Sequence, residues 1–293
     1  MMGRRVGLWL WLSAALLVAD LGAHADAARE PGGVLAYARV TDGYWQIWTY
    51  DLGSDTHTQQ TDDRFDHRDP SWQPDGGLLL RSHNDELFLQ AGGDRSVVPF
   101  RRDLWPAFDP ASHPSREQVV LAKLRTDLKD ASAIWIVGGE KGDQRVLTTG
   151  PGLWNHPRWS SDGSRLTYIR SFGYRGSELR VIDVESGAER VLLADGHHNT
   201  HPEWSPDDRW IVYASDRSGD YEIYLRDVER EEDRVLTGRP GLDIRPAFSP
   251  DGTRIAYTSL VDGRLEIWTV GIDGSGRARL FECDADVSDP AWR

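Results

Sequence analysis

The chain has 293 residues, 39% of them hydrophobic, and its 47 acidic residues outnumber its 34 basic ones to give a formal charge of −13. Nucleic acid and anionic lipid surfaces carry the same sign, so this charge argues against both as partners. It permits a cationic protein or a divalent metal, and it equally serves to keep a surface soluble. Cys283 is the only cysteine, so the chain cannot form an internal disulfide.

The first 25 residues have the pattern of an export signal. Arg4 and Arg5 precede an apolar run over residues 6–19, and small residues surround Ala25. A membrane anchor is the alternative, but a span needs about 20 apolar residues and this run ends at Asp20. We therefore expect a signal peptide at 1–25 cleaved near Ala25, a short segment at 26–33, no transmembrane segment after cleavage, and a periplasmic or secreted protein.

From residue 34 onward the sequence repeats itself. A proline, any residue and then Trp or Phe recurs at intervals of 36, 51, 45, 44 and 44 residues, which is the length of one four-stranded propeller blade. The six anchors are Pro70-Ser-Trp72, Pro106-Ala-Phe108, Pro157-Arg-Trp159, Pro202-Glu-Trp204, Pro246-Ala-Phe248 and Pro290-Ala-Trp292. Their aromatic rings are expected to act as wedges between neighbouring blades.

Each anchor leads into a turn and then into short strands. Phe248-Ser-Pro-Asp-Gly252 is typical of these turns, because Pro presets the first corner and Gly accepts positive φ. An alternating apolar strand, a third strand such as Glu266-Ile-Trp268 and a shorter fourth strand follow. After Phe108 we expect a longer loop instead of the turn. Helical periodicity is missing, so the sequence predicts an all-β fold.

The two ends of the repeat region complement each other. Residues 34–61 hold three strands with no Pro-x-Trp strand before them, whereas residues 289–293 are a Pro-x-Trp strand with nothing after it. Placing the C-terminal strand innermost in the N-terminal blade leaves no exposed sheet edge. We therefore predict a six-bladed β-propeller over 34–293, built of four-stranded blades and closed by the C-terminal strand.

The residues just before the anchor prolines should enter the channel together. They are Asp69, Trp105, His156, His201, Arg245 and Asp289, and Trp154 lies two positions earlier in its blade. We take these seven as candidate binding residues at one mouth of the channel. Trp105 and Trp154 could stack on a sugar or a peptide, or could simply form a hydrophobic plug.

Two interpretations of this ring stay open. His156 and His201 with Asp69 or Asp289 could hold a divalent metal, since imidazole and carboxylate are its natural ligands. Alternatively, the polar groups cap turns and line a wet channel, so that no cofactor is needed. Gly-x-Ser-x-Gly, His-Glu-x-x-His, Gly-x-Gly-x-x-Gly and Cys-x-x-Cys do not occur, and we predict no catalytic residue.

The run Pro-x-Trp-Ser-Pro-Asp-Gly, an apolar strand and Glu-Ile-Trp or Glu-Ile-Tyr resembles the TolB-type (WD40-like, PD40) propeller repeat. The best copies span 202–224 and 246–268, and the resemblance extends over 34–293. It implies a periplasmic propeller that docks an envelope lipoprotein such as Pal. We expect the α/β domain that precedes the propeller in TolB to have no counterpart in this sequence. Oligogalacturonate lyases, also propellers, provide a precedent for a His-rich metal site.

Two functions follow as hypotheses. The first is an exported module of the cell envelope that binds a protein or peptide, and this reading favours a protein that is not an enzyme. The alternative is a metal-assisted lyase or hydrolase acting on a polymer or small molecule in the channel. An accessory scaffold without chemistry of its own is a third possibility.

Overall fold

The computed structural model describes residues 32–82, 84–91, 95–125, 131–138, 142–239 and 241–293. The predicted signal peptide and most of the segment 26–33 therefore lie outside the described residues. Within the described ranges, no helix has the length and apolar character needed to cross a membrane. The two helical segments found there are 3₁₀ turns, η1 (Arg102–Leu104) and η2 (Gly173–Arg175).

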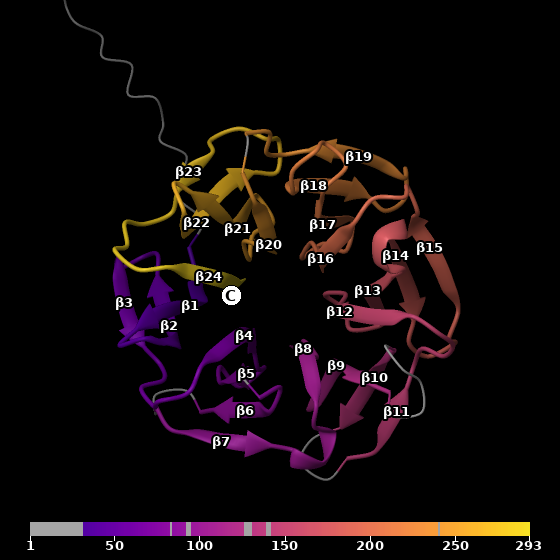
Figure 1. Ribbon diagram of the computed structural model, residues 1–293, viewed down its shortest axis with the longest axis horizontal. Coiled ribbons are helices and arrows are strands. Elements are labelled where there is room, and N and C mark those ends of the chain that lie inside the picture. Colours follow the sequence, from indigo (N-terminus) through magenta and orange to yellow (C-terminus); the bar gives the residue numbers. More distant parts are fainter. Residues whose placement is uncertain (1–31, 83, 92–94, 126–130, 139–141, 240) are drawn as a thin grey trace, which may run out of the picture. The chain divides into compact units, whose positions relative to one another are not determined.

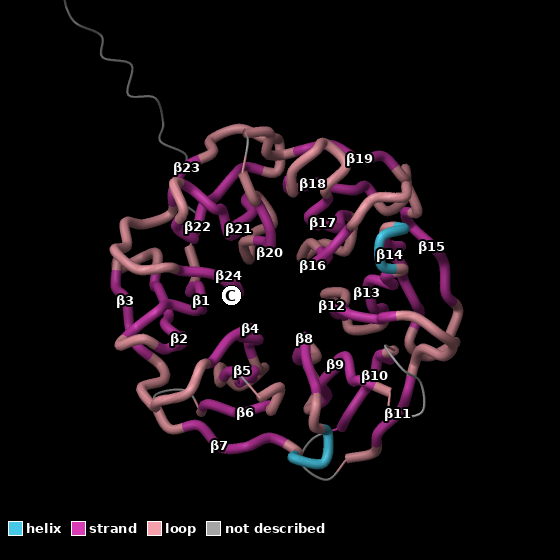
Figure 2. Tube along the Cα trace, in the orientation of Figure 1, coloured by secondary structure: helices cyan, strands magenta, loops and turns pink. Residues whose placement is uncertain are grey.

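Six sheets of four antiparallel strands form a ring around a central channel, which confirms the predicted fold (Figures 1 and 2). Blade one contains β24 (Val287–Trp292), β1 (Val34–Thr41), β2 (Tyr44–Asp51) and β3 (Thr56–Gln59). Blade two contains β4 (His67–Trp72), β5 (Leu78–Ser82), β6 (Leu87–Gln90) and β7 (Val97–Phe100). Blade three contains β8 (Ala107–Ser112), β9 (Gln118–Leu124), β10 (Ser132–Gly138) and β11 (Gln144–Val146).

The remaining three blades follow the same order from the channel outward. Blade four contains β12 (Leu153–Trp159), β13 (Arg165–Ser171), β14 (Ser177–Asp183) and β15 (Glu189–Leu193). Blade five contains β16 (Asn199–Trp204), β17 (Trp210–Ser215), β18 (Glu222–Asp227) and β19 (Glu232–Val235). Blade six contains β20 (Asp243–Phe248), β21 (Arg254–Val261), β22 (Arg264–Gly271) and β23 (Ala278–Arg279).

The C-terminal strand closes the ring as predicted. β24 pairs antiparallel with β1, with Leu35 opposite Trp292 and Arg39 opposite Val287. Val34 and Arg293 exchange both backbone hydrogen bonds, at 2.8 and 3.0 Å. Blade one is thus assembled from the two ends of the propeller, and β1 and β24 lie side by side in Figure 1.

Every innermost strand breaks its pairing at the same point. The register between the first two strands shifts around an x-Pro pair, as between Arg68 and Ser71 in blade two or Thr200 and Glu203 in blade five. Proline has no N–H to donate to the ladder, and the residue before it adopts a positive φ. Such a bulge re-aims the side chain of the residue before proline. The six bulges therefore determine which side chains face the channel.

Blade three corrects the predicted register. Its inner strand is Ala107–Ser112, and its bulge lies at Asp109 and Pro110 rather than at Trp105 and Pro106. The stretch after Phe108 is therefore the second half of that strand and not a loop. The next turn begins at His113, whose N–H donates to the Gln118 carbonyl oxygen. The anchor prolines are then spaced by 40, 47, 45, 44 and 44 residues, a more regular repeat.

The anchor indoles join neighbouring blades, in agreement with the prediction. Trp72 Nε1 donates to the Ala291 carbonyl oxygen at 3.0 Å, and Trp159 Nε1 donates to the Ala111 carbonyl oxygen at 3.2 Å. In both cases the acceptor belongs to the inner strand of the preceding blade. Trp159 also packs in a cluster with residues of blade three, so the large flat ring fills the space between two sheets.

Candidate functional site

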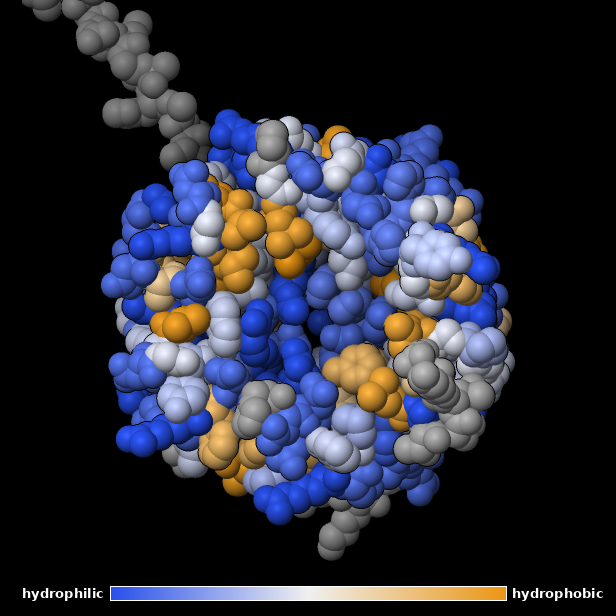
Figure 3. All heavy atoms as spheres, viewed as in Figure 1, coloured by the Kyte–Doolittle hydropathy of each residue, from blue (hydrophilic) through white to orange (hydrophobic). Residues whose placement is uncertain are grey.

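Six side chains, one from each bulge, form a ring inside the channel. All six residues have φ between 49° and 58°, the left-handed region that non-glycine residues seldom adopt: Asp69, Asp109, His156, His201, Arg245 and Asp289. Five of these were predicted from the sequence, and Asp109 takes the position assigned to Trp105. Figure 3 shows hydrophilic residues around the central hollow.

The acidic half of the ring is an ion-pair network centred on Arg245. One terminal nitrogen of this residue, Nη1, lies 2.6 Å from an Asp69 carboxylate oxygen and 2.8 Å from an Asp289 carboxylate oxygen. Arg81 pairs with the second oxygen of Asp69, and Arg68 Nε lies 2.7 Å from Asp289. The Asp69 and Asp289 side chains are 4% and 2% exposed, so both carboxylates depend on these cations for compensation.

The network controls the ionisation of these groups. Burial raises the pKa of the Asp69 carboxyl, but the Arg245 and Arg81 guanidinium groups outweigh burial and hold that pKa well below its usual range. Burial and the neighbouring Asp69 likewise raise the pKa of Asp289, yet Arg245 and Arg68 bring it below the ordinary value. Burial lowers the pKa of Arg245, and the two carboxylates more than reverse this effect. All three groups are therefore charged at neutral pH.

The other half of the ring contains two adjacent imidazoles. The rings of His156 and His201 lie with centroids 4.0 Å apart, and His156 Nδ1 lies 3.1 Å from an Asp109 carboxylate oxygen. Burial, followed by His156 and the nearby Arg245, lowers the pKa of His201 well below its ordinary value. His201 is therefore neutral at physiological pH. Its Nε2 atom is buried and has no hydrogen-bond partner within the described residues.

This arrangement does not fit the predicted metal ligands. A metal held by His156 and His201 with Asp69 or Asp289 would need one of these carboxylates to turn toward the imidazoles, but Arg245 binds both carboxylates. Across the ranges that the structure describes, no three or more His, Cys, Asp or Glu side chains are grouped to hold a metal ion. The four residues lie in one ring, but they do not form a ligand set.

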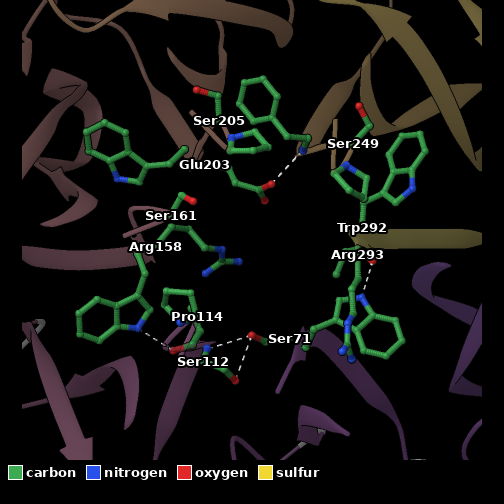
Figure 4. A pocket seen from close by; sticks show the side chains of 18 of the residues that line it. Ser71, Ser112, Pro114, Arg158, Ser161, Glu203, Ser205, Ser249, Trp292 and Arg293 are labelled. Atoms are coloured by element: carbon green, nitrogen blue, oxygen red, sulfur yellow. Dashed lines mark hydrogen bonds between the residues drawn. The ribbon is translucent and has the colours of Figure 1, made fainter. Parts of the chain in front are cut away.

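The channel is narrow at the ring and wider beyond it. A cavity of only about 30 Å³ adjoins Asp69, His201, Arg245 and Asp289. On the side of the Pro-x-Trp ends it opens into a pocket of about 430 Å³, shown in Figure 4. Serine hydroxyls and the anchor rings line much of that pocket: Ser71, Ser112, Ser160, Ser161, Ser205, Ser249, Trp72, Trp159, Trp204, Phe248 and Trp292.

Two charged side chains stand at the base of this pocket, and both also line the narrow cavity. Arg158 and Glu203 are the middle residues of the anchors in blades four and five. Arg158 points into the pocket in Figure 4; it donates to the Pro157 carbonyl oxygen at 2.9 Å and forms no ion pair among the described residues. Glu203 accepts the Phe248 backbone N–H at 2.9 Å. The buried Nε1 atoms of Trp204 and Trp292 likewise lack a described partner.

The sequence reasoning misplaced two tryptophans and missed three residues. Trp154 is 3% exposed in a core cluster with Tyr168, and Trp105 lies in a separate groove at the outer part of blade three. Neither lines the cavity at the ring or the pocket beyond it. Asp109 was detectable, because Asp109-Pro110 repeats the Asp-Pro of the anchors in blades one and two. Arg158 and Glu203 occupy the variable position of the Pro-x-Trp motif, which carries no signal in the sequence.

Glu203 should give the stability of the protein a pH dependence. Burial raises the pKa of its carboxyl to about 7, against an ordinary value of 4.5. The folded chain then binds a proton that the unfolded chain releases, so this group lowers the free energy of unfolding as the pH rises from about 4.5 to about 7. Glu203→Gln should remove this dependence and be more stable than the wild type near neutrality. Urea unfolding of both proteins across that range measures it; parallel pH profiles would refute this assignment.

Comparisons with known proteins agree with the fold. A family model described as the TolB beta propeller domain matches residues 120–293. The uncharacterised protein Atu1656 of Agrobacterium fabrum is 27% identical over 169 residues, which cover 54% of this chain and 58% of that protein. The match thus spans little more than half the length of the curated relative.

Solved structures show the same architecture at low identity. A protein assigned as a TolB from Agrobacterium tumefaciens has a TM-score of 0.72 at 22% identity, covering 87% of this chain and 90% of that chain. TolB from Acinetobacter baumannii has a TM-score of 0.75 at 20% identity, covering 89% and 66%. An oligogalacturonate lyase in complex with manganese has a TM-score of 0.59 at 18% identity, covering 82% and 86%. At these identities the likeness concerns the fold alone.

Proposed function

The chain belongs to the TolB β-propeller domain family, and from this premise we propose that it is an exported binding module that holds a protein or peptide segment at its channel. The observation that carries this proposal is that the charged side chains of the ring are paired, whereas Arg158 in the pocket is unpaired within the described part of the chain. In the ring, Arg245 and the two aspartates neutralise one another. In the pocket, Arg158 has no ion-pair partner among the described residues and faces a space large enough for side chains.

The pocket offers the features of a recognition site. Its anchor rings supply apolar contact area, while the hydroxyls and the free indole N–H groups can bond to a partner's backbone or polar side chains. A rigid propeller presents these groups without a large ordering cost, which favours binding. The partner that fits the family is an envelope protein or peptide, and a Pal-like lipoprotein is the first to test.

The alternative of a metal-assisted lyase or hydrolase has no comparable support. It requires the two imidazoles and Asp69 or Asp289 to act on one ion, and Arg245 already binds both carboxylates. The manganese-bound lyase resembles this chain in fold only. We therefore base the proposed function on the pocket and not on the ring.

Export is part of the proposal, and it rests on the sequence of residues 1–25. Expression of the full chain in a Gram-negative host should yield a mature protein beginning near Asp26, recovered in the periplasm or the medium. Intact mass measurement and cell fractionation provide the test. An unprocessed chain in the cytoplasm would rule out this part of the proposal.

Replacing Arg158 by alanine should weaken partner capture without unfolding the propeller, because Arg158 makes no ion pair within the described fold. We expect a loss of about tenfold in affinity for the protein that wild type captures from envelope extract, the usual scale for one charge-assisted contact. Arg230→Ala removes an exposed arginine at the β18–β19 turn, outside the pocket, and serves as the matched control. Equal capture by both variants would place the partner elsewhere on the protein.

A further inference from the structure

A second concave site lies outside the channel, on the outer part of blade three. It is a groove of about 680 Å³ bounded by Trp105, strands β9 and β10, and the segment that follows β11. Its lining is largely apolar, with Lys123 at one side. None of its lining residues belongs to the channel pocket, so the proposed function does not account for this groove.

The groove arises where blade three departs from the repeat. The second residue of the third-strand pattern is a buried aliphatic in every blade, and the residue before it is Glu or Gln in five blades: Gln46, Glu86, Glu178, Glu222 and Glu266. Blade three has Ala133 at this position, opposite Lys123 in the ladder. Ala133 lines the groove, at the position where the other five blades carry a Glu or Gln side chain.

In three of the other blades this side chain accepts a hydrogen bond from a tryptophan or a threonine. In blade six, Trp268 Nε1 donates to a Glu266 carboxylate oxygen at 2.9 Å. In blade five, the Thr237 hydroxyl donates to Glu222. The corresponding threonine of blade one, Thr61, donates to the Gln46 amide oxygen at 2.6 Å. The acceptor thus satisfies a tryptophan in blade six and a threonine in blades one and five, whereas Glu178 of blade four pairs with Arg180.

Blade three keeps both donors and lacks their acceptor. Trp135 corresponds to Trp268, and its buried Nε1 atom has no hydrogen-bond partner within the described residues. Thr148 corresponds to Thr237, because its hydroxyl accepts the Ile134 N–H at 2.9 Å just as the Thr237 hydroxyl accepts the Ile223 N–H. The Thr148 hydroxyl has no acceptor for its own hydrogen among the described residues. Both residues line the groove, so two donors there lack a described partner.

The rim of the groove indicates what else an occupant must carry. Trp105 is 59% exposed, and its Nε1 donates to the Asn84 carbonyl oxygen at 2.6 Å, which fixes the ring while leaving much of it open. Leu124 is also exposed at the groove. Lys123 adds a positive charge to a protein whose formal charge is −13. Donors, a cation and apolar surface together match a carboxylate with an apolar neighbour.

We propose that this groove binds a peptide partner through a glutamate side chain, which takes the place left by Ala133 and accepts hydrogen bonds from Trp135 and Thr148. An apolar side chain next to that glutamate packs on Trp105 and Leu124. The site therefore recognises an acidic and apolar sequence by contacts of the kind that blades one, five and six make within themselves. It is independent of the channel pocket, and either site can fail without the other.

The test uses two capped peptides that differ in one group, Leu-Glu-Leu and Leu-Gln-Leu, with NMR of labelled tryptophan to follow the Trp135 indole N–H. The Glu peptide should shift that signal. The Gln peptide should bind with an affinity at least about tenfold lower, because it lacks the charge. Ala133→Glu should fill the groove, abolish the shift and raise Tm. Trp105→Ala should weaken binding while the protein stays folded, since the ring is exposed.

Val235→Glu adds the same charge at an exposed fourth-strand position of blade five and should bind as wild type does. Equal affinity for the two peptides would overturn the proposal. So would undiminished binding to folded Ala133→Glu. Free propionate provides a further arm: if it matches the Glu peptide in affinity, the occupant is a small carboxylate and the peptide partner is wrong.

Discussion

Replacing Arg245 by methionine is expected to lower the free energy of unfolding by about 3–5 kcal/mol, the cost of leaving buried charges without their partner. Arg245 binds both Asp69 and Asp289, whose side chains are 4% and 2% exposed. Arg68 and Arg81 would remain, but each reaches only one of the two carboxylates. Urea unfolding near pH 7 measures the loss.

The pH dependence of this loss identifies its cause. In the wild type the pKa values of Asp69 and Asp289 lie below the ordinary value, so their stabilising contribution is complete above the unfolded pKa of 3.8 and is lost as the pH falls below it. Without Arg245 the carboxyls should titrate at higher pH, and the deficit of Arg245→Met should shrink toward about pH 4. Adding Asp69→Asn and Asp289→Asn should restore part of the stability. A deficit of equal size at every pH would indicate lost packing instead.

Removing residues 287–293 is expected to abolish cooperative folding. This deletion takes away the innermost strand of blade one, the Asp289 partner of Arg245, and the two hydrogen bonds between Val34 and Arg293. It also exposes the edge of β1 and opens the ring, so the loss should exceed the 5–15 kcal/mol that typically stabilises a domain. Thermal melting followed by circular dichroism should show no sharp transition. Size-exclusion chromatography should show an aggregated or expanded chain.

A synthetic peptide of residues 286–293 supplies the control for that deletion. Added in trans, it can pair with β1 through the ladder that joins Leu35 to Trp292 and Arg39 to Val287. It should restore a transition whose midpoint rises with peptide concentration. A truncated chain that melts like the full chain would contradict closure by β24.

The fold was predictable because its signals are local and repeated. A proline that cannot pair recurs in every inner strand, and a wedge-shaped ring follows it in every inner strand except that of blade three. There, Pro106-Ala-Phe108 imitates the anchor four residues early, while the true strand has Ser112 at the aromatic position. His113, the next residue, contacts Trp159 instead, with ring centroids 4.6 Å apart. Regular spacing and the Asp-Pro pair were the better guides in that blade.

The site was predictable only in part, because pairing depends on where side chains point. The repeat register predicted that Arg245, Asp69 and Asp289 enter the channel together, but it could not show that the guanidinium binds both carboxylates. Trp154 follows the alternation of its strand into the core. The sequence did contain a signal for the groove at Ala133. Ala133 is a small residue at a position where the other five blades have Glu or Gln.

Crystallography of the mature protein grown with manganese tests the central claim most directly. That claim is that Arg245 pairs with both Asp69 and Asp289, so that these carboxylates are engaged within the ring. The account predicts Arg245 bridging Asp69 and Asp289, with no anomalous signal between those carboxylates and the imidazoles of His156 and His201. A manganese ion bound by both histidines, with Arg245 turned away from the carboxylates, would contradict it.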